Sequence, residues 1–144
     1  MSSSFSIDTF ATEAKVAMNK ADSDKSNIEA RQHAATQYFK QTLEKYGTEE
    51  IKVRLNEAIP AGADIGEMML HTSNELTMIY ARVPPYFMSA VHNHTLFACI
   101  GCLEGKEDNT IYSLQNGSVD LPQTIDRQFT ITSGEVIELP HVSI

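Results

Sequence analysis

Two histidines at alternate positions, His92 and His94, form the pattern in this sequence that most clearly suggests chemistry. On a β-strand, the side chains of residues i and i+2 point to the same face. Two strand rises separate their Cα atoms by about 6.5–7 Å, and neutral imidazole is a common ligand of transition metals. The pair therefore predicts a metal site on an extended segment. The alternative is a chance pair of histidines at the surface.

The first third of the chain, which precedes this pair, predicts helices. Apolar residues recur at helical spacing over 8–21. Ser26 and Glu29 form a capping box that predicts the start of a second helix, and Gly47 predicts its end. Thr48 is expected to cap a third, shorter helix. The helical part should therefore cover residues 1–60 and pack on the part that follows.

Residues 61–144 predict a sheet domain. The sequence changes after the Pro60-Ala61-Gly62 breaker to short, β-branched and aromatic segments separated by turn residues. Many short strands at close spacing are typical of a sandwich or barrel. The expected strands are 67–71, 76–83, 87–94, 97–103, 110–114, 128–132 and 136–139, with a tight turn at Asn116-Gly117.

The residues around the histidine pair resemble a known family motif. The stretch 84–112 reads PPYFMSAVHNHTLFACIGCLEGKEDNTIY. It is similar to the first metal-binding motif of cupins, in the subgroup of the thiol dioxygenases such as cysteine dioxygenase. The matching positions are Pro85, Ser89, Phe97, Ile100, Gly101, Gly105 and Glu107. The resemblance implies a mainly β fold with N-terminal helices: a cupin-type antiparallel β-sandwich or jelly-roll barrel, also called a double-stranded β-helix.

The resemblance also implies a ligand set. Most cupins carry a glutamate ligand where this chain has Ala98 and Cys99, whereas thiol dioxygenases hold their metal with three histidines. The segment 133–140 resembles the start of the second cupin motif. Its histidine would fall just past Ile144, and His141 in a shifted register is the alternative. We therefore expect the barrel to lack its last strands here, with weak metal binding, pairing of copies through open sheet edges, or both.

The implied activity is that of a metal-dependent oxidoreductase, an O₂-dependent oxidation of a small substrate at a mononuclear non-haem iron. Fe(II) is the expected metal, with Ni, Mn or Zn as alternatives. The carboxylate-binding arginine of the thiol dioxygenases is not found in 66–71, and the nearest candidate is Arg82. The other candidate function is therefore a non-catalytic or sensing cupin that binds a small molecule or metal without turnover.

The overall composition excludes several classes of partner. With 11 basic and 19 acidic residues the net charge is −8, which argues against nucleic acid or an anionic membrane as partner. There is no long apolar run and no pattern of a secretory leader, so a cytoplasmic location is expected. Cys99 and Cys102 should face opposite sides of a strand as small buried residues. His71 is expected to be a structural histidine or to line the pocket.

Overall fold

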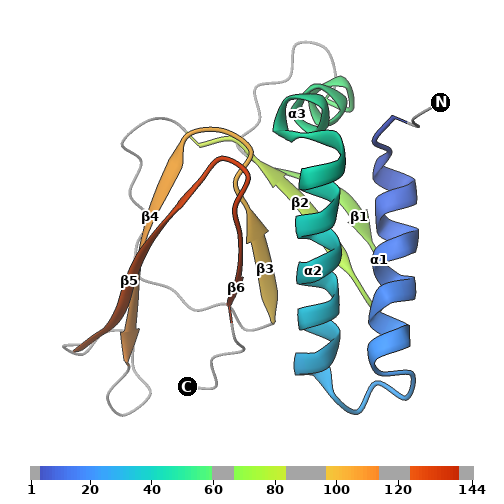
Figure 1. The fold of residues 1–144 in the computed structure, drawn as a ribbon, viewed down its shortest axis with the longest axis horizontal. Helices are drawn as coiled ribbons and strands as arrows, with labels where there is room; N and C mark the ends of the chain where they lie inside the picture. The colour runs from blue at the N-terminus through green and yellow to red at the C-terminus, as the bar shows by residue number, and fades with distance from the viewer. Residues whose placement is uncertain (1–3, 60–66, 84–96, 114–123, 140–144) are drawn as a thin grey trace.

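The computed structural model describes residues 4–59, 67–83, 97–113 and 124–139 (Figure 1). In this part of the chain, three helices precede three two-stranded antiparallel sheets, so helix and sheet are mixed, and no closed barrel is seen. The helices are α1 (Ile7–Ala21), α2 (Ile28–Tyr46) and α3 (Thr48–Glu57). The strands are β1 (Glu67–Thr72), β2 (Thr77–Ala81), β3 (Ala98–Gly101), β4 (Lys106–Ser113), β5 (Thr124–Thr132) and β6 (Val136–Leu139).

Several predictions fall outside the described residues. These are the strand 87–94 with His92 and His94, the boundary at 60–61, the turn at Asn116-Gly117, and His141. The remaining strands all occur near their expected places. The main difference in length is in the β4–β5 pair, where each strand begins four residues earlier than predicted. No helix in the described segments has both the length and the apolar composition needed to cross a bilayer.

The helix starts differ from the predicted caps. The side chain of Asn27, not Ser26, caps α2 by accepting a hydrogen bond from the backbone N–H of Ala30 at 3.1 Å. Ser26 instead donates its hydroxyl to Asp24 at 2.7 Å. Thr48 is the first residue of α3, and no side chain caps that helix. The capping roles given to Ser26 and Thr48 are therefore wrong, because neighbouring residues take the N-cap position in both helices.

The strands from β3 to β6 form one long antiparallel hairpin with a bend in it. β4 pairs with β5, and β3 pairs with β6 outside them, so the second pair encloses the first. At the bend, Cys102 N–H donates to Glu135 O at 2.9 Å, and Gly134 N–H donates to Cys102 O at 2.8 Å. These two bonds carry the pairing across the bend. In Figure 1 the two ladders diverge from this bend, with β3 and β6 on the side next to α2.

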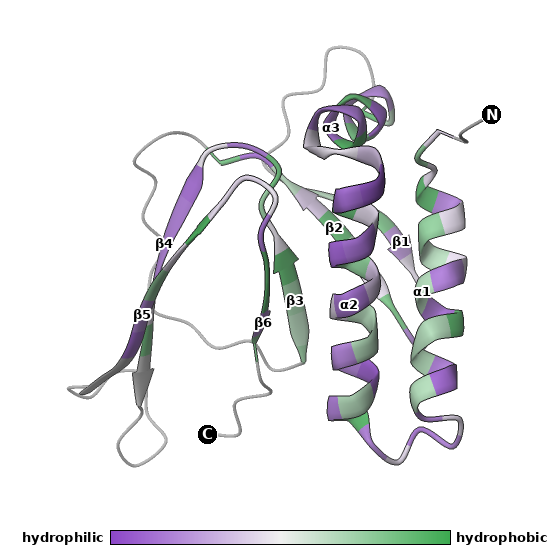
Figure 2. Ribbon diagram, viewed as in Figure 1, coloured by the Kyte–Doolittle hydropathy of each residue, from purple (hydrophilic) through white to green (hydrophobic). Residues whose placement is uncertain are grey.

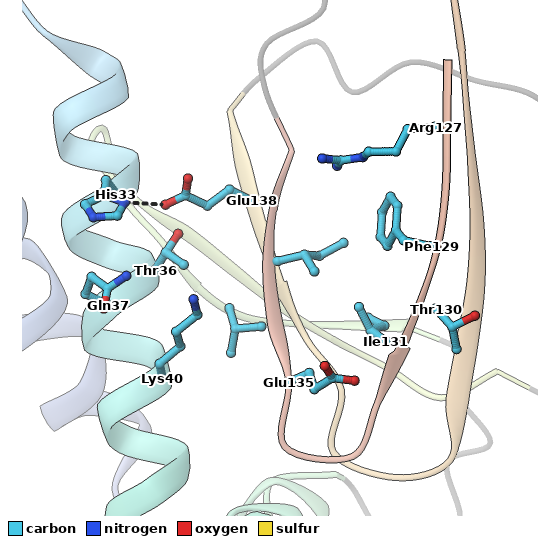
Figure 3. Close-up of a pocket in the computed structure, with 12 residues that line it drawn as sticks. His33, Thr36, Gln37, Lys40, Arg127, Phe129, Thr130, Ile131, Glu135 and Glu138 are labelled. Atoms are coloured by element: carbon cyan, nitrogen blue, oxygen red, sulfur yellow. Dashed lines mark hydrogen bonds and ion pairs between the residues drawn. The ribbon is translucent and has the colours of Figure 1, made fainter. Parts of the chain in front are cut away.

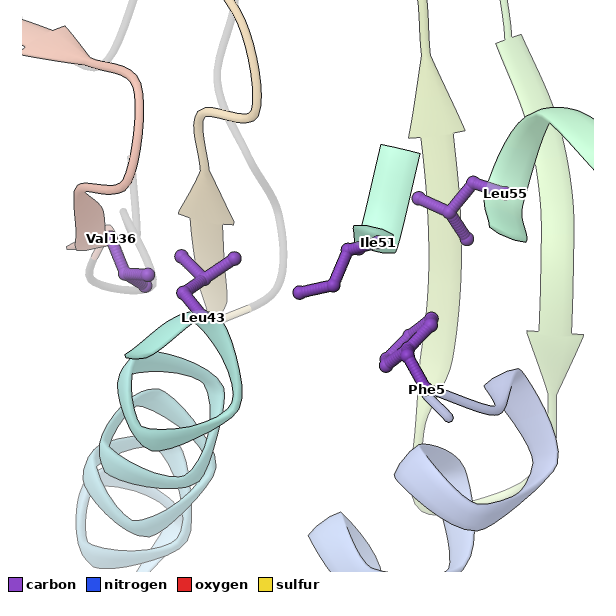
Figure 4. Close-up of a cluster of buried hydrophobic side chains, with 5 residues drawn as sticks. All are labelled: Phe5, Leu43, Ile51, Leu55 and Val136. Carbon is purple, nitrogen blue, oxygen red and sulfur yellow. The ribbon is translucent and has the colours of Figure 1, made fainter. Parts of the chain in front are cut away.

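The hydrophobic core joins the helices to the strands. Its buried residues are Phe5, Leu43, Ile51, Leu55 and Val136 (Figure 4). Half-buried side chains from β1, β2 and β3 pack against them. The helices, the β1–β2 pair and the β3–β6 ladder therefore share this cluster. Figure 2 shows the matching pattern in the hairpin, where β3 is hydrophobic and β4 is largely hydrophilic. Of the helices, α2 is the one that packs on the β3–β6 ladder.

Candidate functional site

The predicted site residues that can be located do not form a metal centre. Within residues 4–59, 67–83, 97–113 and 124–139, no three His, Cys, Asp or Glu side chains come together to hold a metal. Arg82 is exposed directly after β2. His71, on β1, has a buried Nε2 atom without a hydrogen-bond partner in the described part. His71 is therefore not held in place by a hydrogen bond at Nε2 within the described residues.

The two cysteines are free thiols. Burial raises the pKa of the Cys99 thiol on β3, and it also raises the pKa of Cys102 just after that strand. Cys102 Sγ donates to the backbone oxygens of Glu104 and Gly105 at 3.5 and 3.6 Å. Both side chains are thus protonated and partly buried, in agreement with a packing role rather than a reactive one.

A groove of about 460 Å³ lies between α2, β5 and β6 (Figure 3). This volume is within the range of small-molecule sites. From α2 it is lined by His33, Thr36, Gln37 and Lys40; from β5 and β6 it is lined by Arg127, Phe129, Thr130, Ile131, Val136, Ile137 and Glu138; and Glu135 lines it from the turn between these strands. The groove therefore combines charged, amide and apolar groups from segments far apart in the sequence.

Both carboxylates that line the groove are engaged with neighbours. His33 Nδ1 lies 3.1 Å from Glu138 Oε1, which joins α2 to β6. Glu135 Oε1 accepts a hydrogen bond from the Thr132 hydroxyl at 2.6 Å and another from the Thr132 backbone N–H at 2.7 Å. These bonds lower the pKa of Glu135, because they stabilise its ionised form. His33 is exposed and also makes this contact between α2 and β6.

The two permanent cations of the groove, Arg127 and Lys40, have no hydrogen-bonded or ion-pair partner of opposite charge among the described residues. The Arg127 guanidinium lies 4.7 Å from the centre of the Phe129 ring, in a cation–π contact. Neither Arg127 nor Lys40 forms an ion pair with a carboxylate in the described part of the chain. The groove therefore offers two positive charges for which the described residues provide no counter-ion.

Gln32 fixes the position of the ladder that borders this groove. Its side-chain amide donates to Ala98 O at 2.9 Å and to Leu139 O at 2.7 Å. Ala98 and Leu139 are the outermost described pair of the β3–β6 ladder. One residue of α2 therefore contacts both strands of this pair.

We expect Gln32→Leu to lower the free energy of unfolding by about 2 kcal/mol, because two partly buried carbonyl oxygens lose their donor. Urea unfolding at neutral pH measures the change. Gln41→Leu, at an exposed position of the same helix, is the matched control and should change stability by less than about 0.5 kcal/mol. Equal effects of the two substitutions would show that the contacts of Gln32 contribute nothing specific.

Comparisons with known proteins do not assign the chain to a family. No family model matches the sequence, and searches of curated proteins and of solved structures find no significant match. The resemblance of 84–112 to the cupin motif is therefore the basis for any functional proposal, together with the strand pairing described above.

Sequence reasoning missed the groove. Its two ion-pair partners, His33 and Glu138, are 105 residues apart, and no motif relates α2 to β5.

Proposed function

We propose that this chain is the core of a metal-dependent oxidoreductase of the cupin class, similar to thiol dioxygenases. His92 and His94 would be two ligands of a mononuclear Fe(II). A jelly roll is an antiparallel double sheet of eight strands, and folding a long hairpin over bends produces its nested strand pairs. The enclosed β4–β5 ladder and the enclosing β3–β6 ladder match two successive pairs of such a hairpin. This nesting supports the jelly-roll proposal.

A second argument applies if the outer ladder extends beyond its described residues in the same register. Ala98 on β3 pairs with Leu139 on β6. Each further pair outward would join the preceding residue of the β3 side to the following residue of the β6 side. Six steps outward pair His92 with the position directly after Ile144, provided that the ladder continues without a bulge. This is also where the spacing of the second cupin motif expects the third histidine. Side chains directly opposite each other on antiparallel strands have Cβ atoms about 4.5–5.5 Å apart on the same face, which suits two ligands of one ion.

The donor chemistry fits a transition metal. Two neutral imidazoles provide nitrogen ligands suited to Fe, Ni or Zn, and protonation of either ring in acid would weaken binding. A bound Fe(II) ion would supply open coordination positions for a small substrate and O₂. The protonated Cys99, at a position where other cupins carry a carboxylate ligand, would add no negative charge. The two histidines would thus set the coordination geometry of the metal, and apolar residues near them in the sequence would limit the access of water to it.

Metal retention tests the proposal directly. After anaerobic loading with Fe(II) and removal of free metal, we expect bound iron in the parent chain. We expect at least a tenfold weaker affinity in His92→Ala and in His94→Ala. His33→Ala, which removes an exposed histidine on α2, is the control and should keep the parent affinity. Appending a histidine directly after Ile144 should strengthen binding at least tenfold, whereas appending an alanine should not. Equal retention in all variants would contradict the proposal.

The absence of an arginine from 66–71 favours a second candidate, a sensing cupin that binds a ligand without turnover. Oxygen consumption by the iron-loaded protein with a panel of small thiols separates the two. Consumption that is lost in His92→Ala supports the oxidoreductase. A ligand-induced rise in the melting temperature without oxygen consumption supports the sensor.

A further inference from the structure

We propose that the groove between α2, β5 and β6 is a binding site for a small organic carboxylate, held by Arg127 and Lys40. Figure 3 shows these two side chains reaching from opposite walls, Lys40 from α2 and Arg127 from β5. This site is independent of the metal proposal, because all the residues that carry it are described and none of them is a predicted metal ligand.

The two permanent cations of the groove can bind an anion. Glu138 is paired with His33, and Glu135 accepts two hydrogen bonds from Thr132. One oxygen of each carboxylate thus already has a hydrogen-bond partner, whereas Lys40 and Arg127 have no carboxylate partner among the described residues. A carboxylate in the groove can therefore accept charge-assisted hydrogen bonds, which are stronger than neutral ones.

The binding geometry is partly organised in advance. The Arg127 guanidinium rests on the Phe129 ring at 4.7 Å, which limits the conformations that the side chain must lose on binding. Arg127, Phe129 and Ile131 alternate along β5, so they project to the same face of the strand. One wall therefore presents a cation beside an aromatic ring and an aliphatic side chain, which suits a carboxylate attached to an apolar body.

The apolar surface makes a bare inorganic ion a poor match. Ile131 and Val136, which line the groove, are 2% and 7% exposed and form a rigid base. Half-buried Gln37 adds an amide that can donate to the ligand. The net charge of −8 disfavours long polyanions such as nucleic acid, because most of their charge would lie outside the groove. A small carboxylate with an aromatic or aliphatic body fits these conditions.

Calorimetric titration of the metal-free protein with benzoate tests this inference, in a chelator-free buffer so that no other carboxylate competes. Benzamide has nearly the same shape without the charge, and acetate has the charge without the ring. We expect saturable binding of benzoate and at least tenfold weaker binding of both analogues. Benzamide binding as tightly as benzoate, or no binding of benzoate at all, would overturn the proposal.

Matched variants locate the site. Arg127→Gln and Lys40→Gln should each weaken benzoate binding at least fivefold, and both positions are exposed, so the fold should persist. Lys20→Gln makes the same charge change at an exposed position of α1 and should have no effect. Melting temperatures of all three variants check that the fold is retained. If the two groove variants behave like Lys20→Gln, the site is not this groove. A failure here leaves the iron-retention result unaffected, so the two proposals can be judged separately.

Discussion

Replacing Arg31 by methionine is expected to lower the free energy of unfolding by about 3 kcal/mol, because buried charged hydrogen-bond donors are lost and their acceptors are left without partners. Arg31 is only 6% exposed. Its Nη1 donates to Asp22 O at 2.7 Å, to Asn19 Oδ1 at 2.9 Å and to Met18 O at 3.4 Å. Its Nη2 lies 3.3 Å from Glu75 Oε2. One side chain on α2 thus holds the end of α1 and the turn between β1 and β2.

Urea unfolding of Arg31→Met and Arg31→Lys measures this effect. Lysine restores the charge but not the planar fork that reaches several acceptors at once, so it should recover less than half of the loss. Arg82→Met is the control, because Arg82 is exposed, and it should change stability by less than about 0.5 kcal/mol. A change in Arg31→Met as small as in the control would contradict the role given to Arg31.

The effect of Arg31 should also depend on pH through Glu75. Burial alone would raise the pKa of Glu75, but attraction to Lys25 and Arg31 outweighs it and lowers the pKa. A lowered pKa in the folded state stabilises the protein above the ordinary pKa of a glutamate. That contribution is lost as the pH falls through the lowered value. The stability difference between the parent and Arg31→Met should therefore shrink in acid but not vanish, because the bonds to backbone oxygens remain.

Substitution of Gly101 by alanine is expected to cost about 2 kcal/mol of stability, because the added methyl group overpacks the contact between β3 and α2. A Cβ atom at this position would lie 2.5 Å from Phe39 Cζ and 2.9 Å from Cε1. The Phe39 ring cannot withdraw freely, because it packs edge-to-face on Phe10 with ring centres 5.5 Å apart. Lack of space, rather than an unusual backbone angle, therefore requires a glycine here.

A double-mutant cycle with Phe39→Leu tests this explanation. The smaller side chain makes room for the methyl group, so the double variant should be more stable than the two separate losses predict, by at least about 1 kcal/mol. Chemical unfolding of the four proteins gives the coupling energy. Strictly additive losses would mean that Phe39 is not the side chain that excludes a larger residue at position 101.

The helices were predictable because their signals are local. Apolar spacing and Gly47 were enough to predict α1 and the end of α2, and Gly47 does adopt a positive φ of 81°. The choice between Ser26 and Asn27 as the cap was not predictable, because both types accept from backbone N–H groups. Asp22 and Asp24 decided it by engaging the Ser26 hydroxyl and leaving Asn27 to cap α2.

The sheet was predictable in outline, and its pairing was not. The predicted strand began at residue 110, after the charged residues at the start of β4, yet Lys106 already pairs with Thr132. The strand begins there because its partner provides the backbone bonds while its side chains remain in water. Neither the groove nor the contacts of Gln32 have a sequence signal, since both depend on how α2 packs against strands that are distant in sequence. The predicted metal ligands lie outside the described residues, so that part of the candidate site stays a prediction.

The enclosed arrangement of the two ladders also implies an order of folding. Ser113 and Thr124 are 11 residues apart in sequence, whereas Ala98 and Leu139 are 41 apart. Closing a loop costs entropy that grows with its length, by about 0.6 kcal/mol for each doubling. Once the inner strands have met, the outer ones are already near each other, and the remaining search is short. Pairing can therefore proceed from the β4–β5 ladder to the β3–β6 ladder, so that the contacts of α2 with β3 and β6 would form after the inner strands have paired.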